Sequence, residues 1–145
     1  RSEGEFLDSF FGDGRDYDKR GFVDCVRASY RWLPGLEELL AELRDAGCAM
    51  HAFSNYPDWY LMIEERLTLS RFLDWSFVSC LMGLRKPDPA VYAQVLNELQ
   101  VPAEACVFVD DRFSNCEAAR QAGIRAIQFE ELGSLRRGLR DAGAL

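Results

Sequence analysis

The five residues VFVDD (residues 107–111) place two carboxylates directly after a short apolar run. Val107, Phe108 and Val109 are β-branched or aromatic and favour a buried strand, and Asp110 and Asp111 follow at once. Taken alone, adjacent acids at a strand end more often form a turn. Two neighbouring carboxylates also repel each other unless a cation lies among them, and hard oxygen ligands suit Mg²⁺. The stretch therefore predicts a buried strand that ends at a turn or at a divalent metal.

Outward from this stretch, strand-like and helical segments alternate from Leu33 onward. Continuous apolar strands separated by helices are typical of a parallel sheet covered on both faces, so the fold class is α/β. Ligands of such sheets bind just beyond the carboxyl ends of the strands. The expected strands are 49–54, 75–80, 105–110 and 124–129, and the expected helices are 33–47, 57–70, 88–99, 114–123 and 132–143.

Two helix starts carry sequence signals. Asp88 is placed to cap a helix whose first residue is Pro89, and Ser114 with Glu117 three residues on forms a capping box. Residues 1–32 do not follow the alternation, because they are aromatic-rich and helical. We expect them to be the C-terminal part of a helical cap over the strand ends, with an N-terminal helix packed on the domain edge as the alternative. Residues 33–145 then form the core domain.

Composition limits the partners. The 145 residues suit one domain, and 48% hydrophobic with 28% charged residues is the balance of a folded globular protein. The net charge of −7 argues against a nucleic-acid or anionic-membrane surface, and no apolar stretch has membrane-spanning length. The chain begins without Met, so we expect that upstream residues were removed or not included.

The cysteines and the single histidine are predicted to be structural. Five cysteines form no CxxC pair, which indicates reduced core thiols in an intracellular, reducing compartment. His51 lies inside a strand-like run and is expected to be a hydrogen-bonded structural imidazole rather than a ligand or base.

Three strand ends supply complementary chemistry. Ser54 and Asn55 follow the first strand at an expected helix start, where free N–H groups favour an anion such as phosphate. Lys86 follows the second strand, and Pro87 biases its backbone toward an extended conformation. Asp110 and Asp111 follow the third. Each signal is weak alone, but all three fall on one sheet edge. A lysine and a metal there would neutralise a phosphate and the charge that develops on it during transfer.

These residues resemble the motifs of the haloacid dehalogenase superfamily. HAFSN (51–55) is similar to its second motif, GLRKPDPAVY (83–92) to its third, and VFVDDRFSNCEAARQAGI (107–124) to its fourth. The order and spacing agree over about residues 30–130. The phrases FFGDGRDYD, HAFSNYPDWY and RKPDPAVY most resemble the chloroplast flavin mononucleotide (FMN) hydrolases of plants and algae.

The resemblance implies a Rossmann-like three-layer fold, Mg²⁺ as cofactor, and hydrolysis of a small phosphomonoester through an aspartyl-phosphate. By position, Ser54 and the Asn55 backbone would bind the phosphoryl group, and Lys86 would stabilise it and the nucleophile. Asp111 would bind the metal directly, with Asp110 beside it as a ligand or one shell out. FMN as substrate and the chloroplast stroma as location are implied by the same resemblance.

The family's first motif, Asp-x-Asp-x-Thr, does not occur in residues 1–145. The nucleophile, the general acid/base and one metal ligand are therefore expected upstream or on another polypeptide. The first-motif strand lies mid-sheet in the family, so two buried strand edges would be unpaired without it. A catalytically inactive structural subunit of a larger assembly is the alternative. A receiver domain is disfavoured, because Lys86 precedes the acid pair instead of following it.

The sequence leaves the substrate open. Trp32, Tyr56, Trp59 and Tyr60 are able to stack on a flat ring such as a flavin, although packing between helices is the commoner role of such residues.

Overall fold

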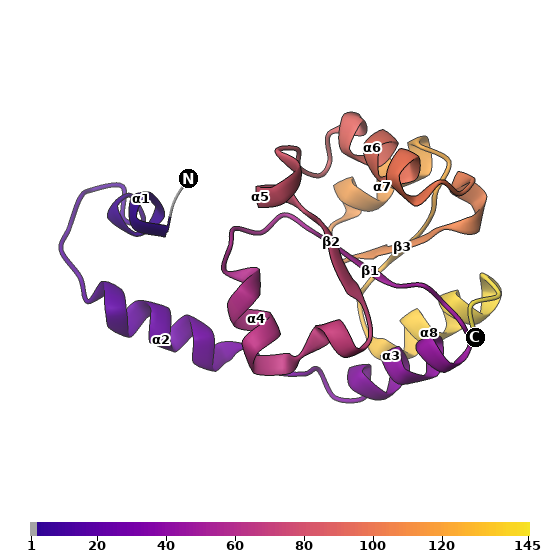
Figure 1. Ribbon diagram of the computed structural model, residues 1–145, viewed down its shortest axis with the longest axis horizontal. Coiled ribbons are helices and arrows are strands. Elements are labelled where there is room, and N and C mark those ends of the chain that lie inside the picture. Colours follow the sequence, from indigo (N-terminus) through magenta and orange to yellow (C-terminus); the bar gives the residue numbers. More distant parts are fainter. Residues whose placement is uncertain (1–2) are drawn as a thin grey trace.

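The computed structural model describes residues 3–145 and forms eight helices and four strands there (Figure 1). The strands are β1 (His51–Ser54), β2 (Asp74–Val78), β3 (Val107–Asp110) and β4 (Arg125–Gln128). The helices are α1 (Glu3–Asp8), α2 (Lys19–Ser29), α3 (Leu36–Asp45), α4 (Tyr60–Leu67), α5 (Ser79–Met82), α6 (Pro89–Leu99), α7 (Phe113–Gln121) and α8 (Leu132–Asp141). In this described range no helix combines the length and the apolar character needed to cross a membrane.

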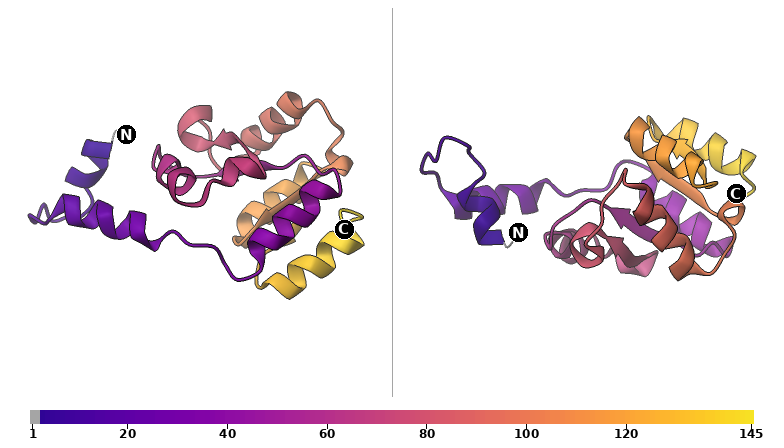
Figure 2. Two further views of the ribbon diagram at one scale, coloured as in Figure 1. Left: turned by 60° about the horizontal axis from the view of Figure 1, so that its bottom comes forward. Right: turned by 90° about the horizontal axis from the view of Figure 1, so that it is seen from above.

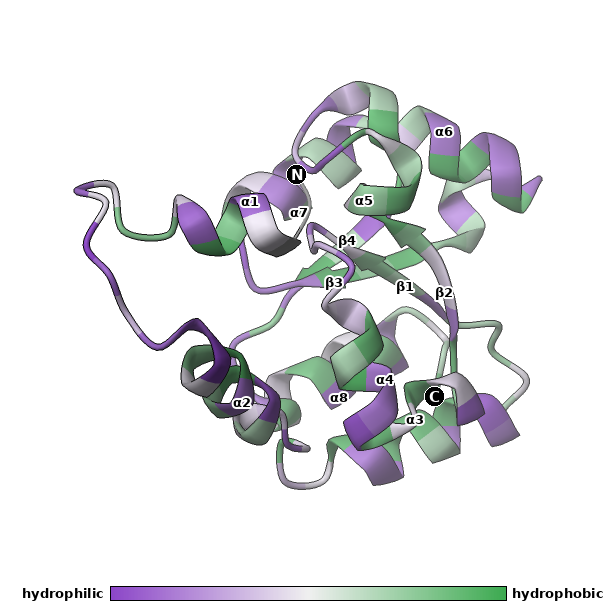
Figure 3. Ribbon diagram, turned by 60° about the vertical axis from the view of Figure 1, so that its left-hand side comes forward, coloured by the Kyte–Doolittle hydropathy of each residue, from purple (hydrophilic) through white to green (hydrophobic). Residues whose placement is uncertain are grey.

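The elements form three layers. Helices α5, α6 and α7 lie on one side of the strands, and α3, α4 and α8 lie on the other (Figures 1 and 3). The strands are coloured largely hydrophobic in Figure 3, as expected for a sheet covered on both faces. Helices α1 and α2 stand to one side and join α3 through an extended segment (Figure 2). The predicted α/β class with a Rossmann-like core is confirmed.

The sheet is divided in two. β1 pairs with β2 and β3 pairs with β4, both in parallel, and no ladder joins β1 to β3 within residues 3–145. The inner edges of β1 and β3 therefore lack strand partners in the described chain. This is the arrangement expected of a parallel sheet from which a middle strand is missing.

Aromatic side chains hold the two strand pairs together on the α6–α7 face. The ring of Phe53 from β1 lies 5.4 Å from that of Phe108 on β3, and both contact Tyr92, which is fully buried on α6. The Tyr92 hydroxyl donates to the Asn115 carbonyl at 2.8 Å, so the one polar atom of this cluster is satisfied. β1 and β3 are thus neighbours through side chains and not through backbone.

The opposite face is less complete. Leucines of α3 and α8 form a buried cluster there: Leu39, Leu43, Leu135 and Leu139. Val109, in the middle of β3, is nevertheless 39% exposed. An exposed valine in a central strand marks the place where the division of the sheet leaves the core uncovered.

Several local expectations were wrong. The capping box at Ser114 does not form, because α7 begins one residue earlier and Arg112 is its N-cap. The strand expected over 75–80 ends at Val78, since Ser79–Met82 forms a helical turn that Gly83 ends in the left-handed conformation. Asp88 does cap α6, accepting a hydrogen bond from the Ala90 N–H.

The expectation for the cysteines was partly wrong, and the expectation for His51 was confirmed. The five thiols are free, but Cys25 and Cys80 are exposed rather than part of the core. His51 is structural as expected, with its Nδ1 atom 2.9 Å from the Ser76 hydroxyl on β2.

Candidate functional site at the ends of β1 and β3

Lys86 is the centre of the site. It lies in the segment between α5 and α6, and its side chain is only 6% exposed. Its Nζ atom donates to Asp110 Oδ2 at 2.6 Å and to the Phe53 carbonyl at 2.5 Å. It also lies 4.8 Å from the Phe53 ring centre and 5.1 Å from that of Phe108. The ammonium group therefore joins the carboxyl ends of β1 and β3, where their backbones do not pair.

Asp110 is fully committed to protein partners. Besides Lys86, its carboxylate accepts the Arg112 N–H at 2.8 Å and the Asn115 side-chain amide at 2.9 Å. Burial works against ionisation of this group, but the hydrogen bonds from Lys86, Arg112 and Asn115 outweigh it and hold the pKa of Asp110 below its ordinary value. Asp110 is thus an anion that fixes Lys86. The hydrogen bond from Asn115 to Asp110 was not predicted from the sequence.

Asp111 differs from its neighbour. Its side chain is exposed, and its carboxylate has no hydrogen-bond or ion-pair partner among residues 3–145. Only its backbone is held, since the Asp111 carbonyl accepts from Gln128 at 3.0 Å. Of the two adjacent acids, Asp110 is therefore buried and paired, and Asp111 is exposed with a free carboxylate among residues 3–145.

The acid pair fits Mg²⁺ in part. No three His, Cys, Asp or Glu side chains gather into a possible metal cluster in the described part of the chain. Mg²⁺, however, is commonly held by one or two carboxylates together with waters and substrate phosphate. The free carboxylate of Asp111 beside Asp110 matches that donor set, and a complete site needs further ligands.

Ser54 and Asn55 end β1 beside Lys86. The Ser54 hydroxyl has no hydrogen-bond partner within residues 3–145, while the carbonyl just before it, that of Phe53, accepts from Lys86. The expected helix start at this point is wrong: α4 begins at Tyr60, after a turn closed by the bond from Tyr60 N–H to the Pro57 carbonyl. The N–H groups of a helix N-terminus are therefore not available at this point for an anion. The Asn55 side chain is hydrogen-bonded to the backbone of Lys86.

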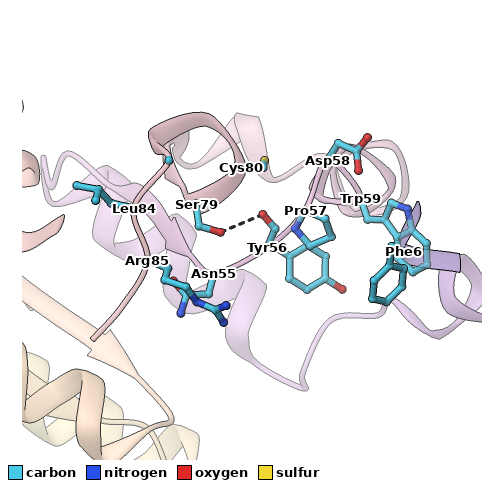
Figure 4. A pocket seen from close by; sticks show the side chains of 11 residues that line it. Phe6, Asn55, Tyr56, Pro57, Asp58, Trp59, Ser79, Cys80, Leu84 and Arg85 are labelled. Atoms are coloured by element: carbon cyan, nitrogen blue, oxygen red, sulfur yellow. Dashed lines mark hydrogen bonds between the residues drawn. The ribbon is translucent and has the colours of Figure 1, made fainter. Parts of the chain in front are cut away.

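A cavity of about 410 Å³ adjoins this edge of the sheet (Figure 4). Phe6 and Trp59 lie at one end of it and Leu84 and Arg85 at the other. Tyr56 and Asn55 connect the cavity to the end of β1. The exposed Arg85 side chain makes no ion pair with any described residue, so the cavity contains an uncommitted cation next to apolar surface.

Three of the four aromatic residues singled out in the sequence serve in packing. Trp59 is 6% exposed and contacts the Phe6 ring, Tyr60 packs on Trp75, and Trp32 on Phe72. Tyr56 lines the cavity, with its hydroxyl 2.8 Å from that of Tyr30.

The fold and this cluster together define a parallel α/β domain whose charged side chains meet beyond the strand ends, as in Rossmann-like hydrolases. A family model described as haloacid dehalogenase-like hydrolase matches residues 4–123. The chain belongs to this family.

Individual relatives agree with that assignment. The chain is 44% identical over 141 residues to Flavin mononucleotide hydrolase 1 of Arabidopsis thaliana, whose name marks it as chloroplastic, covering 97% of this chain and 58% of the relative. It is 34% identical to a sesquiterpene phosphatase of Aspergillus oryzae over 77% of this chain and 56% of the relative. A phosphoglycolate phosphatase of Pseudomonas savastanoi is 33% identical over 65% of this chain and 35% of its own length. The chain thus spans about half the length of these curated relatives, or less.

A solved structure shares the fold. A haloacid dehalogenase family enzyme of Bacteroides thetaiotaomicron, crystallised with magnesium and inorganic phosphate, superposes with a TM-score of 0.77 at 19% identity. The superposition covers 94% of this chain and 73% of that enzyme.

Proposed function

We propose that this protein is a Mg²⁺-dependent phosphomonoester hydrolase that acts through an aspartyl-phosphate, with FMN as its substrate. The observation that carries the proposal is the position of Lys86, whose ammonium group links Asp110 on β3 to the peptide before Ser54 on β1. A buried cation at the carboxyl ends of two parallel strands is suited to a phosphate, because it stabilises the negative charge of the transferring group.

The residues of this chain have separate tasks in that proposal. The free Ser54 hydroxyl and the Asn55 backbone N–H donate to phosphoryl oxygens, and Lys86 neutralises their charge. An aspartate from outside residues 1–145 attacks the phosphorus as the bond to the leaving oxygen breaks, and the general acid, also from outside these residues, protonates that oxygen to give the alcohol. Water then hydrolyses the acyl phosphate and releases inorganic phosphate. Bound Mg²⁺, held by Asp111 with Asp110 beside it, would supply Lewis-acid stabilisation of the phosphoryl oxygens.

We place the missing aspartate on a strand between β1 and β3, supplied by polypeptide outside residues 1–145. The absence of a ladder between these strands in the described chain and the 39% exposure of Val109 support this placement. Such a strand would pair with both inner edges and cover Val109. Residues 1–32 would then be the last part of a cap, and residues 33–145 the core that lacks this strand.

Hydrogen exchange tests the strand. In residues 1–145 alone, we expect the backbone amides on the inner edges of β1 and β3 to exchange rapidly, because no ladder protects them. In the full-length protein the same amides exchange only on global unfolding, while those of β4 behave alike in both proteins. Equal, fast exchange at β1 and β3 in the full-length protein would contradict the placement.

FMN as substrate, and a chloroplast location, are supported by the relative that bears that name. The cavity beside Asn55 supports the same substrate, since Tyr56 offers an aromatic face and Arg85 an uncommitted donor for the carbonyl groups of a flavin.

Phosphate release tests the function. We expect the full-length protein with Mg²⁺ to hydrolyse FMN with a higher kcat/KM than a generic aryl phosphate. Arg85→Ala should raise KM for FMN about tenfold through the loss of one charge-assisted hydrogen bond, with little effect on the aryl phosphate. Arg66→Ala, an exposed change on α4, is the matched control. No turnover of either ester with Mg²⁺ would refute the hydrolase.

One observation favours a second candidate, a catalytically inactive subunit of a larger assembly. Residues 1–145 contain no Asp-x-Asp-x-Thr stretch, so this part of the protein lacks the aspartate nucleophile of the family's first motif. The same assay separates the two functions, because an inactive subunit would release no phosphate while still showing protected β1 and β3 amides in its complex.

A further inference from the structure

The side-chain amide of Asn55 is joined to the backbone of Lys86 by two hydrogen bonds. Its Nδ2 group donates to the Lys86 carbonyl at 2.7 Å, and its Oδ1 atom accepts the Lys86 N–H at 2.8 Å. The two residues are 31 positions apart in the sequence, one at the end of β1 and the other just before α6. One amide therefore satisfies both backbone groups of the lysine.

We infer that Asn55 is a positioning residue that sets the height and direction of the Lys86 ammonium group; this inference rests on the proposed phosphatase function. Lys86 lies in neither a helix nor a strand, so no ladder fixes its backbone. The hydrogen bond from the Asp88 N–H to the Arg85 carbonyl closes a turn around Lys86 and Pro87, but it uses neither the N–H nor the carbonyl of Lys86. The Asn55 side chain supplies the two backbone partners that a neighbouring strand would otherwise provide, and Asn55 directly follows Ser54. The hydroxyl and the ammonium are thereby held in one frame.

Asparagine suits this task because it carries a donor and an acceptor on one planar group. An aspartate at position 55 would still accept the Lys86 N–H, but its second oxygen would face the Lys86 carbonyl oxygen and repel it. Alanine leaves both backbone groups without a partner at a site that is only partly open to water. Oδ1 and one of the two Nδ2 N–H groups are occupied by Lys86, so at most one donor of this amide is left for another partner.

The position of the Lys86 ammonium group matters because most of its N–H donors already have partners in the protein. An ammonium has three donors. Two of them point at the Phe53 carbonyl and at Asp110, which leaves one for a phosphoryl oxygen. A shift of about 1 Å in a group that contacts the transition state lowers the rate about 100-fold. Loss of the Asn55 bonds frees the backbone of Lys86 and permits such a shift.

The kinetic test uses Asn55→Ala and Asn55→Asp in the full-length protein, with Asn97→Ala on the exposed face of α6 as control. We expect kcat to fall about 100-fold in both Asn55 variants. KM should stay within about threefold of wild type, because substrate contacts remain. The control retains both constants. Asn55→Asp is nearly isosteric and keeps one of the two bonds, so it provides a folded variant if Asn55→Ala unfolds.

A spectroscopic test does not depend on activity. In the full-length protein labelled at lysine for NMR, the Lys86 signal is identified by its loss in Lys86→Met. The side-chain protons of Lys86 should show ring-current shifts from Phe53 and Phe108, above which its Nζ atom lies. Asn55→Ala and Asn55→Asp are expected to remove these shifts, and Asn97→Ala to preserve them.

The outcomes separate the two claims. A wild-type protein without phosphatase activity refutes the proposed function, while the lysine spectra still decide whether Asn55 positions Lys86. Unchanged Lys86 shifts in the Asn55 variants would overturn the inference, as would a rise in KM at constant kcat, which would make Asn55 a direct substrate ligand.

Discussion

Replacing Lys86 with methionine is expected to lower kcat for phosphate release by about 100- to 1,000-fold, the loss typical of a removed donor to transition-state charge. The same change should destabilise the protein by about 3–5 kcal/mol, because it leaves the Asp110 carboxylate buried without its cation. Activity is measured as phosphate release by the full-length protein, and stability by denaturant unfolding. Methionine keeps most of the apolar stem and removes the ammonium group that lies over the Phe53 and Phe108 rings.

Two further variants separate catalysis from stability. The double change Lys86→Met with Asp110→Asn removes both charges, so most of the lost stability should return while activity stays low. Lys19→Met removes the other lysine, which is exposed and paired with Asp8 on the surface, and should leave activity unchanged. Recovery of activity in the double variant would show that Lys86 serves only to neutralise Asp110.

The Lys86–Asp110 ion pair also makes the stability of the protein depend on pH. The pKa of Asp110 is lowered in the folded protein, so the unfolded chain takes up the proton first as pH falls. The stability contributed by this carboxylate is complete above its unfolded pKa of about 4 and is lost as pH falls through the lower folded value. In Lys86→Met the pKa of Asp110 rises, and the acid-induced loss of stability moves to higher pH.

Asp111→Asn is expected to abolish Mg²⁺-dependent turnover with almost no cost in stability. Loss of a metal ligand removes several kcal/mol of charge stabilisation, which corresponds to about 1,000-fold in kcat/KM. The side chain is exposed and unpaired within the described residues, so the free energy of unfolding should change by less than about 0.5 kcal/mol. The measurement is a Mg²⁺ titration of activity beside an unfolding curve.

The control for this change is Asp141→Asn, which neutralises another exposed acid at the end of α8. It should shift neither the Mg²⁺ dependence nor the stability. If Asp111→Asn keeps wild-type turnover at saturating Mg²⁺ and at low Mg²⁺, the acid is not a metal ligand and belongs to the turn that adjacent acids commonly form.

The alternation of apolar strand-like runs with helical segments from Leu33 onward was enough to predict the α/β class. It was also enough to predict that Ser54 and Asp110 end strands and that Lys86 follows one, although these strands form two separate pairs among residues 3–145. The bond from Lys86 to Asp110 was not predicted, because it depends on the rotamer of a side chain that crosses two rings. The two hydrogen bonds between Asn55 and the Lys86 backbone were not predicted either, because an asparagine after a strand looks in the sequence like an ordinary helix cap.

Helix starts were the least predictable feature. The signal at Asp88 succeeded because Pro89 follows it and fixes the first turn. The helix starts expected at residues 57 and 114 were wrong because local hydrogen bonds compete. A turn closed between Tyr60 and Pro57 delays α4, and Asp110 accepts the Arg112 N–H at the start of α7. The division of the sheet followed from the missing motif and not from any local pattern.

The two-part sheet has a consequence for how this polypeptide behaves in concentrated solution. In residues 1–145 without the proposed middle strand, the unpaired inner edges of β1 and β3 are templates on which a second molecule is able to add a strand, and Val109 supplies apolar contact there. The net charge of −7 opposes such contacts between copies at low ionic strength, and salt screens it. Strand pairing at these edges therefore favours self-association and the net negative charge opposes it, so we expect rising salt to increase self-association.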